Sequence, residues 1–166
     1  MPRFALRFDP VEFEAGPGFR LPAFRPAVTV SVDGSSIQPY CFFDTGAPLS
    51  VVSYSVARHL TVRPVPVSDP VPRFVRGVPA GQVPAREFLS WEGLPCGLAE
   101  LTARFRDVRT GQVSQPVRWV AKVLQVPSPL FSDNFVILGM QLLSDNAGTL
   151  HIDTQPWGLG GYLELP

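Results

Sequence analysis

Apolar and polar residues alternate over several short stretches of the chain, and this pattern predicts β-strands. It is clearest over 4–8 and 28–32, where every second residue is apolar, as in strands that bury one face. The stretches 37–43 and 49–53 are rich in aromatic and β-branched residues, and we expect both to be strands. The residues between them, 44–48, contain Gly and Pro and predict a tight turn.

Further short strands, hairpins and little helix are predicted for the rest of the chain. Asp33-Gly34 is a strong turn signal between the first strands, and Thr110-Gly111 marks a later turn. We expect one hairpin over 74–88, with a Gly-rich tip, and another formed by 101–108 and 117–124. Single strands are expected over 135–138, 149–153 and 162–165. One or two helical turns are expected over 55–60, capped by Ser53 or Ser55, and a short helix over 140–145.

Three stretches predict irregular structure. The stretch 12–26 is interrupted by several glycines and prolines, which indicates a loop or an edge segment. The proline-rich stretch 63–73 predicts an extended, polyproline-like connector, and 91–96 has no regular pattern. With 19 prolines and 14 glycines among 166 residues, long helices are excluded. The predicted fold class is therefore mainly β, and the length fits a single domain spanning 1–166.

Charge and cysteine content restrict the expected partners and compartment. The formal net charge is zero, from 14 basic and 14 acidic residues, which gives no electrostatic reason to expect nucleic acid or an anionic membrane as partner. No stretch approaches the roughly 20 apolar residues of a membrane-spanning helix, and we recognise no signal peptide. Two cysteines do not make a disulfide framework, so we expect a cytoplasmic protein.

No metal or cofactor site is predicted. The sequence has no phosphate-binding loop, no dinucleotide fingerprint and no Gly-x-Ser-x-Gly nucleophile motif. We expect Cys41, three residues before Asp44 on a strand, to be a buried structural thiol that faces away from it. The cysteines and histidines match no compact zinc spacing: Cys41, His59, Cys96 and His151.

Asp44 stands out because it follows the apolar pair Phe42-Phe43 and precedes Thr45-Gly46. A buried carboxylate is costly unless hydrogen bonds or a proton compensate its charge. One role is structural, since an Asp before Gly commonly accepts backbone N–H groups in a turn. The other is catalytic, because two carboxylates about 3 Å apart share one proton and can activate a water. No other Asp in the chain precedes a hydroxyl residue and Gly, so a second copy of the chain would have to supply the second carboxylate.

These residues resemble the active-site stretch of retropepsin-like aspartic proteases, with Asp44-Thr45-Gly46-Ala47 followed by the apolar stretch 49–53. The stretch from Phe135 to Ile152 is similar to the hydrophobic-hydrophobic-Gly segment, short helix and closing strand of that family. The hairpin over 74–88 lies between the two motifs, where the family has its flap. The matching core runs from about residue 27 to 153.

The resemblance implies a closed retropepsin-like β-barrel and a homodimer with one Asp44 from each subunit. It implies hydrolysis of a peptide or protein substrate, without a cofactor, by a water held between the two carboxylates. Thr45 would bond across the two-fold axis, Gly46 would let the substrate backbone approach, and Gly139 would permit a close crossing beneath the Asp44 loop. The remaining residues expected to contact substrate are Ala47 and the flap tip: Gly77, Val78, Pro79, Ala80 and Gly81.

Two positions depart from the family pattern. Members often carry an acidic residue soon after the first motif, paired with an Arg after the later glycine, but Pro48 and Met140 stand near those places here. We therefore expect that ion pair to be missing. The resemblance does not account for 1–26, 91–116 and 154–166. An alternative therefore remains open, in which a related fold binds peptides or proteins without cleaving them, as a monomer or as a different dimer.

Overall fold

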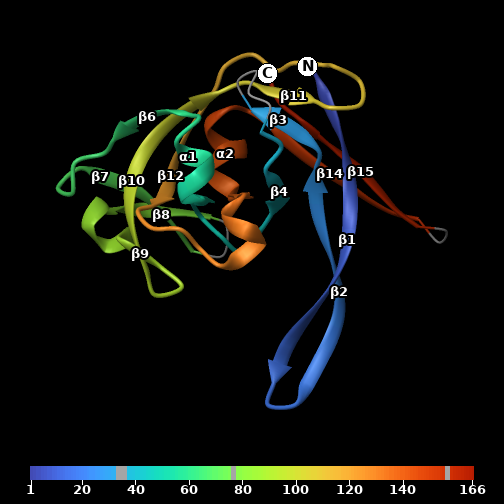
Figure 1. Ribbon diagram of the computed structural model, residues 1–166, viewed down its shortest axis with the longest axis horizontal. Helices are drawn as coiled ribbons and strands as arrows, with labels where there is room; N and C mark the ends of the chain where they lie inside the picture. The colour runs from blue at the N-terminus through green and yellow to red at the C-terminus, as the bar shows by residue number, and fades with distance from the viewer. Residues whose placement is uncertain (33–36, 76–77, 156–157) are drawn as a thin grey trace.

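The computed structural model describes residues 1–32, 37–75, 78–155 and 158–166. Most of this part of the chain lies in strands, and the helices are short (Figure 1), which confirms the expected mainly β class. The strands are β1 (Arg3–Gly16), β2 (Phe19–Val28), β3 (Val30–Val32), β4 (Tyr40–Phe43), β5 (Ser50–Val52), β6 (Thr61–Pro64), β7 (Pro70–Val75), β8 (Val78–Pro84), β9 (Ser90–Trp91), β10 (Leu94–Ala103), β11 (Phe105–Asp107), β12 (Val117–Leu124), β13 (Phe135–Leu138), β14 (Thr149–Gln155) and β15 (Gly158–Glu164). The helices are α1 (Tyr54–Ala57) and α2 (Met140–Asp145), with 3-10 turns η1 (Ala85–Phe88) and η2 (Leu130–Asp133).

The largest sheet is open, so the expected closed barrel is not found. Its strands follow the order β14-β15-β1-β2-β4-β13-β5-β12-β10-β6, with β9 also paired to β10. In the described residues the two end strands, β14 and β6, do not pair with each other, and Figure 1 shows them on opposite sides of the molecule. The long strands β1, β2, β14 and β15 carry one edge of the sheet away from the body. Two smaller pairs, β3 with β11 and β7 with β8, stand apart from this sheet.

Strands β4, β13 and β5 lie side by side at the centre of the large sheet. β13 pairs in parallel with β4 and antiparallel with β5. Side chains on both faces of these strands are buried, and alternate residues join one of two apolar clusters: Val136 and Leu138 join one, and Phe135 and Ile137 join the other. A strand covered on both faces reads as a continuous apolar run, which explains why the sequence predicted them.

A long hairpin formed by β1 and β2 occupies the stretch 12–26, where we expected a loop or an edge segment. The loop is not found, and the strands of this two-stranded ribbon have free edges. Its ladder extends from Leu6↔Val28 to Gly16↔Phe19. The prolines do not interrupt it, because each strand of a two-stranded ribbon has a free edge where a missing N–H removes no ladder bond. Figure 1 shows this hairpin extending beyond the rest of the chain, toward the bottom of the view. Residues 9–26 are called the arm below.

The proline-rich stretch 63–73 is mostly strand, so the expected connector is also wrong. β6 takes up its first residues and β7 its last, and only 65–69 lie between them. β6 is the end strand of the large sheet, and β7 pairs with β8 alone in the described residues, so the prolines again lie at edges. Within 91–96, β9 and β10 meet at a tight turn with positive φ at Glu92 and Gly93.

The remaining expectations are largely confirmed. Helix α2 covers the expected 140–145, and the expected strands 149–153 and 162–165 lie within the hairpin of β14 and β15. β10 and β12 form the hairpin expected over 101–124, although 105–107 departs from it to pair with β3 as β11. The expected turn at 33–34 lies outside the described residues.

Helix α1 is shorter than the predicted helical turns over 55–60, and Ser53 is its N-cap residue. The Ser53 hydroxyl does not cap the helix. It accepts a hydrogen bond from the backbone N–H of Phe135 at 3.2 Å, while the Ser53 N–H donates to the Phe135 carbonyl at 3.1 Å. This residue therefore ties the end of β5 to the start of β13.

Candidate active site

Asp44 lies in the tight turn that links β4 to β5, and its side chain is exposed. The turn is closed by the Ala47 N–H, which donates to the Asp44 carbonyl at 3.0 Å. The Gly46 N–H donates to Asp44 Oδ1 at 2.9 Å, so the turn holds one carboxylate oxygen. From the described part of the chain, no hydrogen bond reaches the other oxygen, Oδ2. The side chain is thus oriented by its own turn and open to solvent on one side.

Strand β13 passes directly beneath this turn. The Asp44 N–H donates to the Leu138 carbonyl at 3.1 Å, and the Gly139 N–H donates to the buried Ser50 hydroxyl at 3.0 Å. A Cβ added at Gly139 would lie 2.6 Å from the Leu49 carbonyl carbon and 2.8 Å from the Ser50 nitrogen. Only glycine fits so close to another backbone. The expected close crossing at Gly139 is therefore confirmed.

Backbone hydrogen bonds link the end of the turn to helix α2. The Met140 N–H donates to the Ala47 carbonyl at 3.0 Å, and the Gln141 N–H donates to the Pro48 carbonyl at 3.1 Å. These bonds satisfy two N–H groups of the first helical turn, which would otherwise lack partners. In the proteases that the sequence resembles, an ion pair links the same two segments, the end of the first motif and the residue after the later glycine. Pro48 lacks an N–H but can still take part here, because the bond uses only its carbonyl oxygen.

A groove of about 440 Å³ opens beside Asp44. Asp44 and Thr45 come from the turn, and four residues of the lining come from the arm. Asp44 is the acidic residue of this lining, and Arg25 of the arm is the basic one. Ala47 does not line the groove and is half-buried. The lining residues are Val11, Phe24, Arg25, Pro26, Phe42, Phe43, Asp44, Thr45 and Ile152.

The hairpin of β7 and β8 differs from the expected flap in its register. Val75 pairs with Val78, whereas Gly77, expected at the flap tip, lies outside the described residues. The expected tip residues Val78, Pro79, Ala80 and Gly81 lie in strand β8, so their expected position at the tip is wrong. Their contact with substrate stays a prediction. Gly81 has a φ of +98° and lies where the register shifts. Such a β-bulge explains why a glycine stands within the strand instead of at the turn.

The base of this hairpin packs against Leu49, which lies between the Asp44 turn and β5. Val71 of β7 and Ala85 after β8 share a buried cluster with Leu49 and with Leu98 of β10. Backbone hydrogen bonds from Ala85 and Arg86 to the loop before β7 close the base. The hairpin is therefore fixed at its base next to the end of the Asp44 turn.

A polar cluster that the sequence did not reveal anchors the arm to β4. The Tyr40 hydroxyl donates to Asp9 Oδ2 at 2.8 Å, and Arg7 binds the same carboxylate through Nε at 2.6 Å and Nη2 at 3.0 Å. These hydrogen bonds, first from Arg7 and then from Tyr40, lower the pKa of Asp9 below its usual value. Only the two-residue spacing of Arg7 and Asp9 on one strand face was visible beforehand.

Aromatic side chains pack under Arg25 at the rim of the groove. Its guanidinium carbon lies 4.4 Å from the centre of the Phe42 ring and 5.6 Å from that of Phe131. Phe131, Ser132 and Asp133 all have φ near +50°, which is strained for residues other than glycine. The Asp133 carboxylate stabilises this turn by accepting N–H groups from Ser55 and Ser128, both at 3.0 Å. No sequence pattern indicates such a turn.

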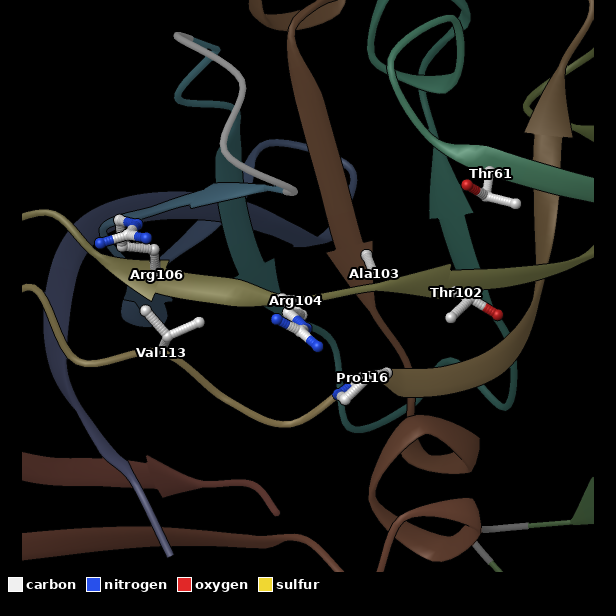
Figure 2. A pocket seen from close by; sticks show the side chains of 7 residues that line it. All are labelled: Thr61, Thr102, Ala103, Arg104, Arg106, Val113 and Pro116. Atoms are coloured by element: carbon white, nitrogen blue, oxygen red, sulfur yellow. The ribbon is translucent and has the colours of Figure 1, made fainter.

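A larger hollow, of about 570 Å³, lies near β6 and β11. Figure 2 shows Arg104 near Thr102 of β10, whereas Arg106 of β11 lies on the other side of the view from Thr61 of β6. It shares no lining residue with the Asp44 groove, so it is a separate surface feature. Its lining consists of Thr61, Thr102, Ala103, Arg104, Arg106, Val113 and Pro116.

The cysteines are buried in different apolar clusters. Cys41 is fully buried, as expected of a structural thiol, and this burial raises the pKa of the thiol to about 12. In the described residues, no three His, Cys, Asp or Glu side chains gather as metal ligands would. No described helix has the length and apolar character needed to cross a bilayer.

Comparison with models of known protein families, with curated proteins and with solved structures finds no match.

Proposed function

We propose that this protein is an aspartic endopeptidase of the retropepsin-like kind, which acts as a homodimer. The observation that carries the proposal is the geometry of the Asp44 turn: an exposed carboxylate, held through one oxygen by Gly46, above a crossing strand that passes at Gly139. The twin of Asp44 comes from a second copy, because the groove beside it supplies no other carboxylate. A two-fold axis beside the turn brings the two acids together.

The pair works as a general acid and a general base. Two carboxylates about 3 Å apart hold one proton between them, and a water binds to both. The ionised carboxylate takes a proton from the water, whose oxygen attacks the carbonyl carbon of the peptide bond. The protonated carboxyl gives its proton to the carbonyl oxygen. When the tetrahedral intermediate collapses, the C–N bond breaks and the carboxyl that took the water proton gives it to the leaving amine. The other carboxylate takes a proton from a hydroxyl of the intermediate, so an acid and an amine are released and the pair again holds one proton.

The surroundings of Asp44 suit an extended peptide. The groove offers apolar side chains such as Phe24, Phe43 and Ile152 close to the carboxylate. Thr45 is exposed beside the proposed axis, where its hydroxyl bonds to the partner subunit. The hairpin of β7 and β8, fixed at its base near Leu49, covers the bound peptide and excludes water.

The test is cleavage of a peptide library by the wild-type protein and by Asp44→Asn. Loss of cleavage is expected with the fold retained, because the amide oxygen of the introduced side chain still accepts the Gly46 N–H but accepts no proton from water. Asp69→Asn is the matched control, since Asp69 is also exposed but lies outside the groove. Cleavage that survives in Asp44→Asn, or a wild type that cleaves nothing as a dimer, contradicts the proposal.

One observation favours a second function, a binding module without proteolysis. The bond from the Gly46 N–H to Asp44 Oδ1 is the bond that a purely structural Asp makes in such a turn. In that case the groove binds an apolar peptide segment, and Asp44→Asn leaves both the affinity for peptide and the oligomeric state unchanged. The library assay therefore separates the two functions.

A further inference from the structure

The arm carries exposed apolar side chains that nothing in its own subunit covers. Beyond Leu6 and Ala27, strands β1 and β2 pair only with each other in the described residues. Phe19 and Phe24 are each 59% exposed, and Leu21 is 36% exposed. A two-stranded ribbon of this kind is only marginally stable in water by itself. The length of the arm and its exposed side chains therefore indicate a surface that another molecule covers.

The position of the arm identifies that molecule as a second copy of the chain. Four arm residues, among them Phe24 and Arg25, line the same groove as Asp44. If a two-fold axis brings the two Asp44 carboxylates together, the partner subunit must also contact the arm. The reason is that the arm and Asp44 of one subunit line the same groove. This step rests on the proposed function.

The charges and the edges of the arm fit a contact between identical subunits. Asp9, Glu12 and Glu14 on β1 are balanced by Arg7 at the base of the arm and by Arg20 and Arg25 on β2, so two arms meet without net repulsion. The Arg20–Glu12 pair lies at 3.5 Å within one arm. Prolines on both strands remove edge donors, which disfavours the open-ended addition of strands and favours contact through side chains.

We propose that each arm packs across the two-fold axis onto the partner subunit, with Phe24 and the side chains nearer the arm's tip buried in that contact. The dimer is then held by two reciprocal arm contacts as well as by the Asp44 turns. The catalytic groove is complete only when both arms are in place.

The test is the dimer dissociation constant, measured by sedimentation for the wild type, Phe24→Arg and Phe19→Arg. A rise of at least about tenfold is expected for either arm variant, because burying an unpaired guanidinium in an apolar contact is unfavourable. Val108→Arg is the control: Val108 is 42% exposed, lies outside the arm and the groove, and its substitution leaves the constant unchanged. All three positions are exposed, and circular dichroism verifies that the variants fold.

The outcomes separate this inference from the proposed function. A wild-type dimer that cleaves peptides and that neither arm variant weakens overturns the arm contact and leaves the protease standing. A dimer that the arm variants weaken but that cleaves no peptide overturns the protease and leaves the arm contact standing. A wild-type chain that stays monomeric at all concentrations overturns both.

Discussion

Substitution of Gly139 by Ala tests the crossing on which the Asp44 turn rests. The added methyl would lie 2.6 Å from the Leu49 carbonyl carbon and 2.8 Å from both the Leu49 oxygen and the Ser50 nitrogen. All three are backbone atoms, so no side chain can rotate away and the two segments must separate. Overpacking of this kind costs about 1–3 kcal/mol. Separation also strains the hydrogen bond from the Gly139 N–H to the buried Ser50 hydroxyl, whose loss costs about 1–3 kcal/mol.

We therefore expect Gly139→Ala to lower the free energy of unfolding by about 3 kcal/mol or more. For a chain of this length, that corresponds to a fall in Tm of about 6–12 °C. The measurement is urea unfolding followed by circular dichroism, with a thermal melt of the same samples. Peptide cleavage should also fall, since the segments that separate carry the Asp44 turn.

Gly97→Ala is the matched control. Gly97 lies in β10, and a Cβ there would meet only the Gln125 side chain, at 3.5 Å, which is an ordinary contact. We expect its stability to stay within about 1 kcal/mol of the wild type. If Gly139→Ala unfolds at the same urea concentration as Gly97→Ala and the wild type, the described crossing beneath Asp44 is wrong.

Three further predictions concern the turn, the core and the arm. Gly46→Ala places a methyl 3.2 Å from Asp44 Oδ1, an exposed side-chain atom, so we expect peptide cleavage to fall about tenfold or more with little change in Tm; unchanged cleavage would contradict this. Burial raises the pKa of the Cys41 thiol from 9.0 to about 12, so above pH 9 the thiol ionises more readily in the unfolded chain than in the folded one. The free energy of unfolding should therefore fall by about 2–3 kcal/mol between pH 9 and pH 11, and Cys41→Ser should lack this contribution to the alkaline decline. Tyr40→Phe removes a hydrogen bond to Asp9 and should cost about 0.5–1.5 kcal/mol at neutral pH. Because the lowered pKa of Asp9 stabilises the fold above the usual Asp range and this is lost on acidification, the difference from wild type should shrink as the pH falls; a constant difference would exclude this linkage.

The centre of the fold could be predicted from the sequence because its signals are local. Residues 135–138 form an uninterrupted apolar run, as expected of a strand buried on both faces, and Gly139 ends it. The helix over 140–145 is stopped by Asn146, whose side-chain amide donates to the Leu142 carbonyl at 2.8 Å. The turn at 44–47 combines an Asp and a Gly that bond to each other. Each of these features depends on residues that are close in sequence.

The long hairpin of the arm and the register of β7 with β8 could not be predicted, because their determinants are not local. Proline excludes a residue from a central strand but not from an edge, and the sequence does not say which strands are edges. The prolines in 12–26 therefore indicated a loop or an edge segment, and those in 63–73 an extended connector. Gly81 fits a turn as well as a bulge, and only the pairing partner decides between the two.

The groove wall depends on contacts between distant segments. Tyr40 meets Asp9 across 31 positions of the sequence, and Arg25 lies over Phe131, which a strained turn holds in place. Neither pairing leaves a periodic or motif-like trace. The open sheet has the same origin, since closure depends on where the long strands β1, β2, β14 and β15 lead and not on any one motif.

The central claim is that one active site needs two Asp44 carboxylates, and a mixing experiment tests it most directly. Wild-type protein and Asp44→Asn are unfolded together in equal amounts, refolded, and assayed for peptide cleavage at a concentration where the wild type is dimeric. Random pairing leaves about one quarter of the dimers with two carboxylates, so we expect about one quarter of the activity of the same total amount of wild type. Activity of about one half would mean that each subunit cleaves with its own Asp44, and would contradict the shared site.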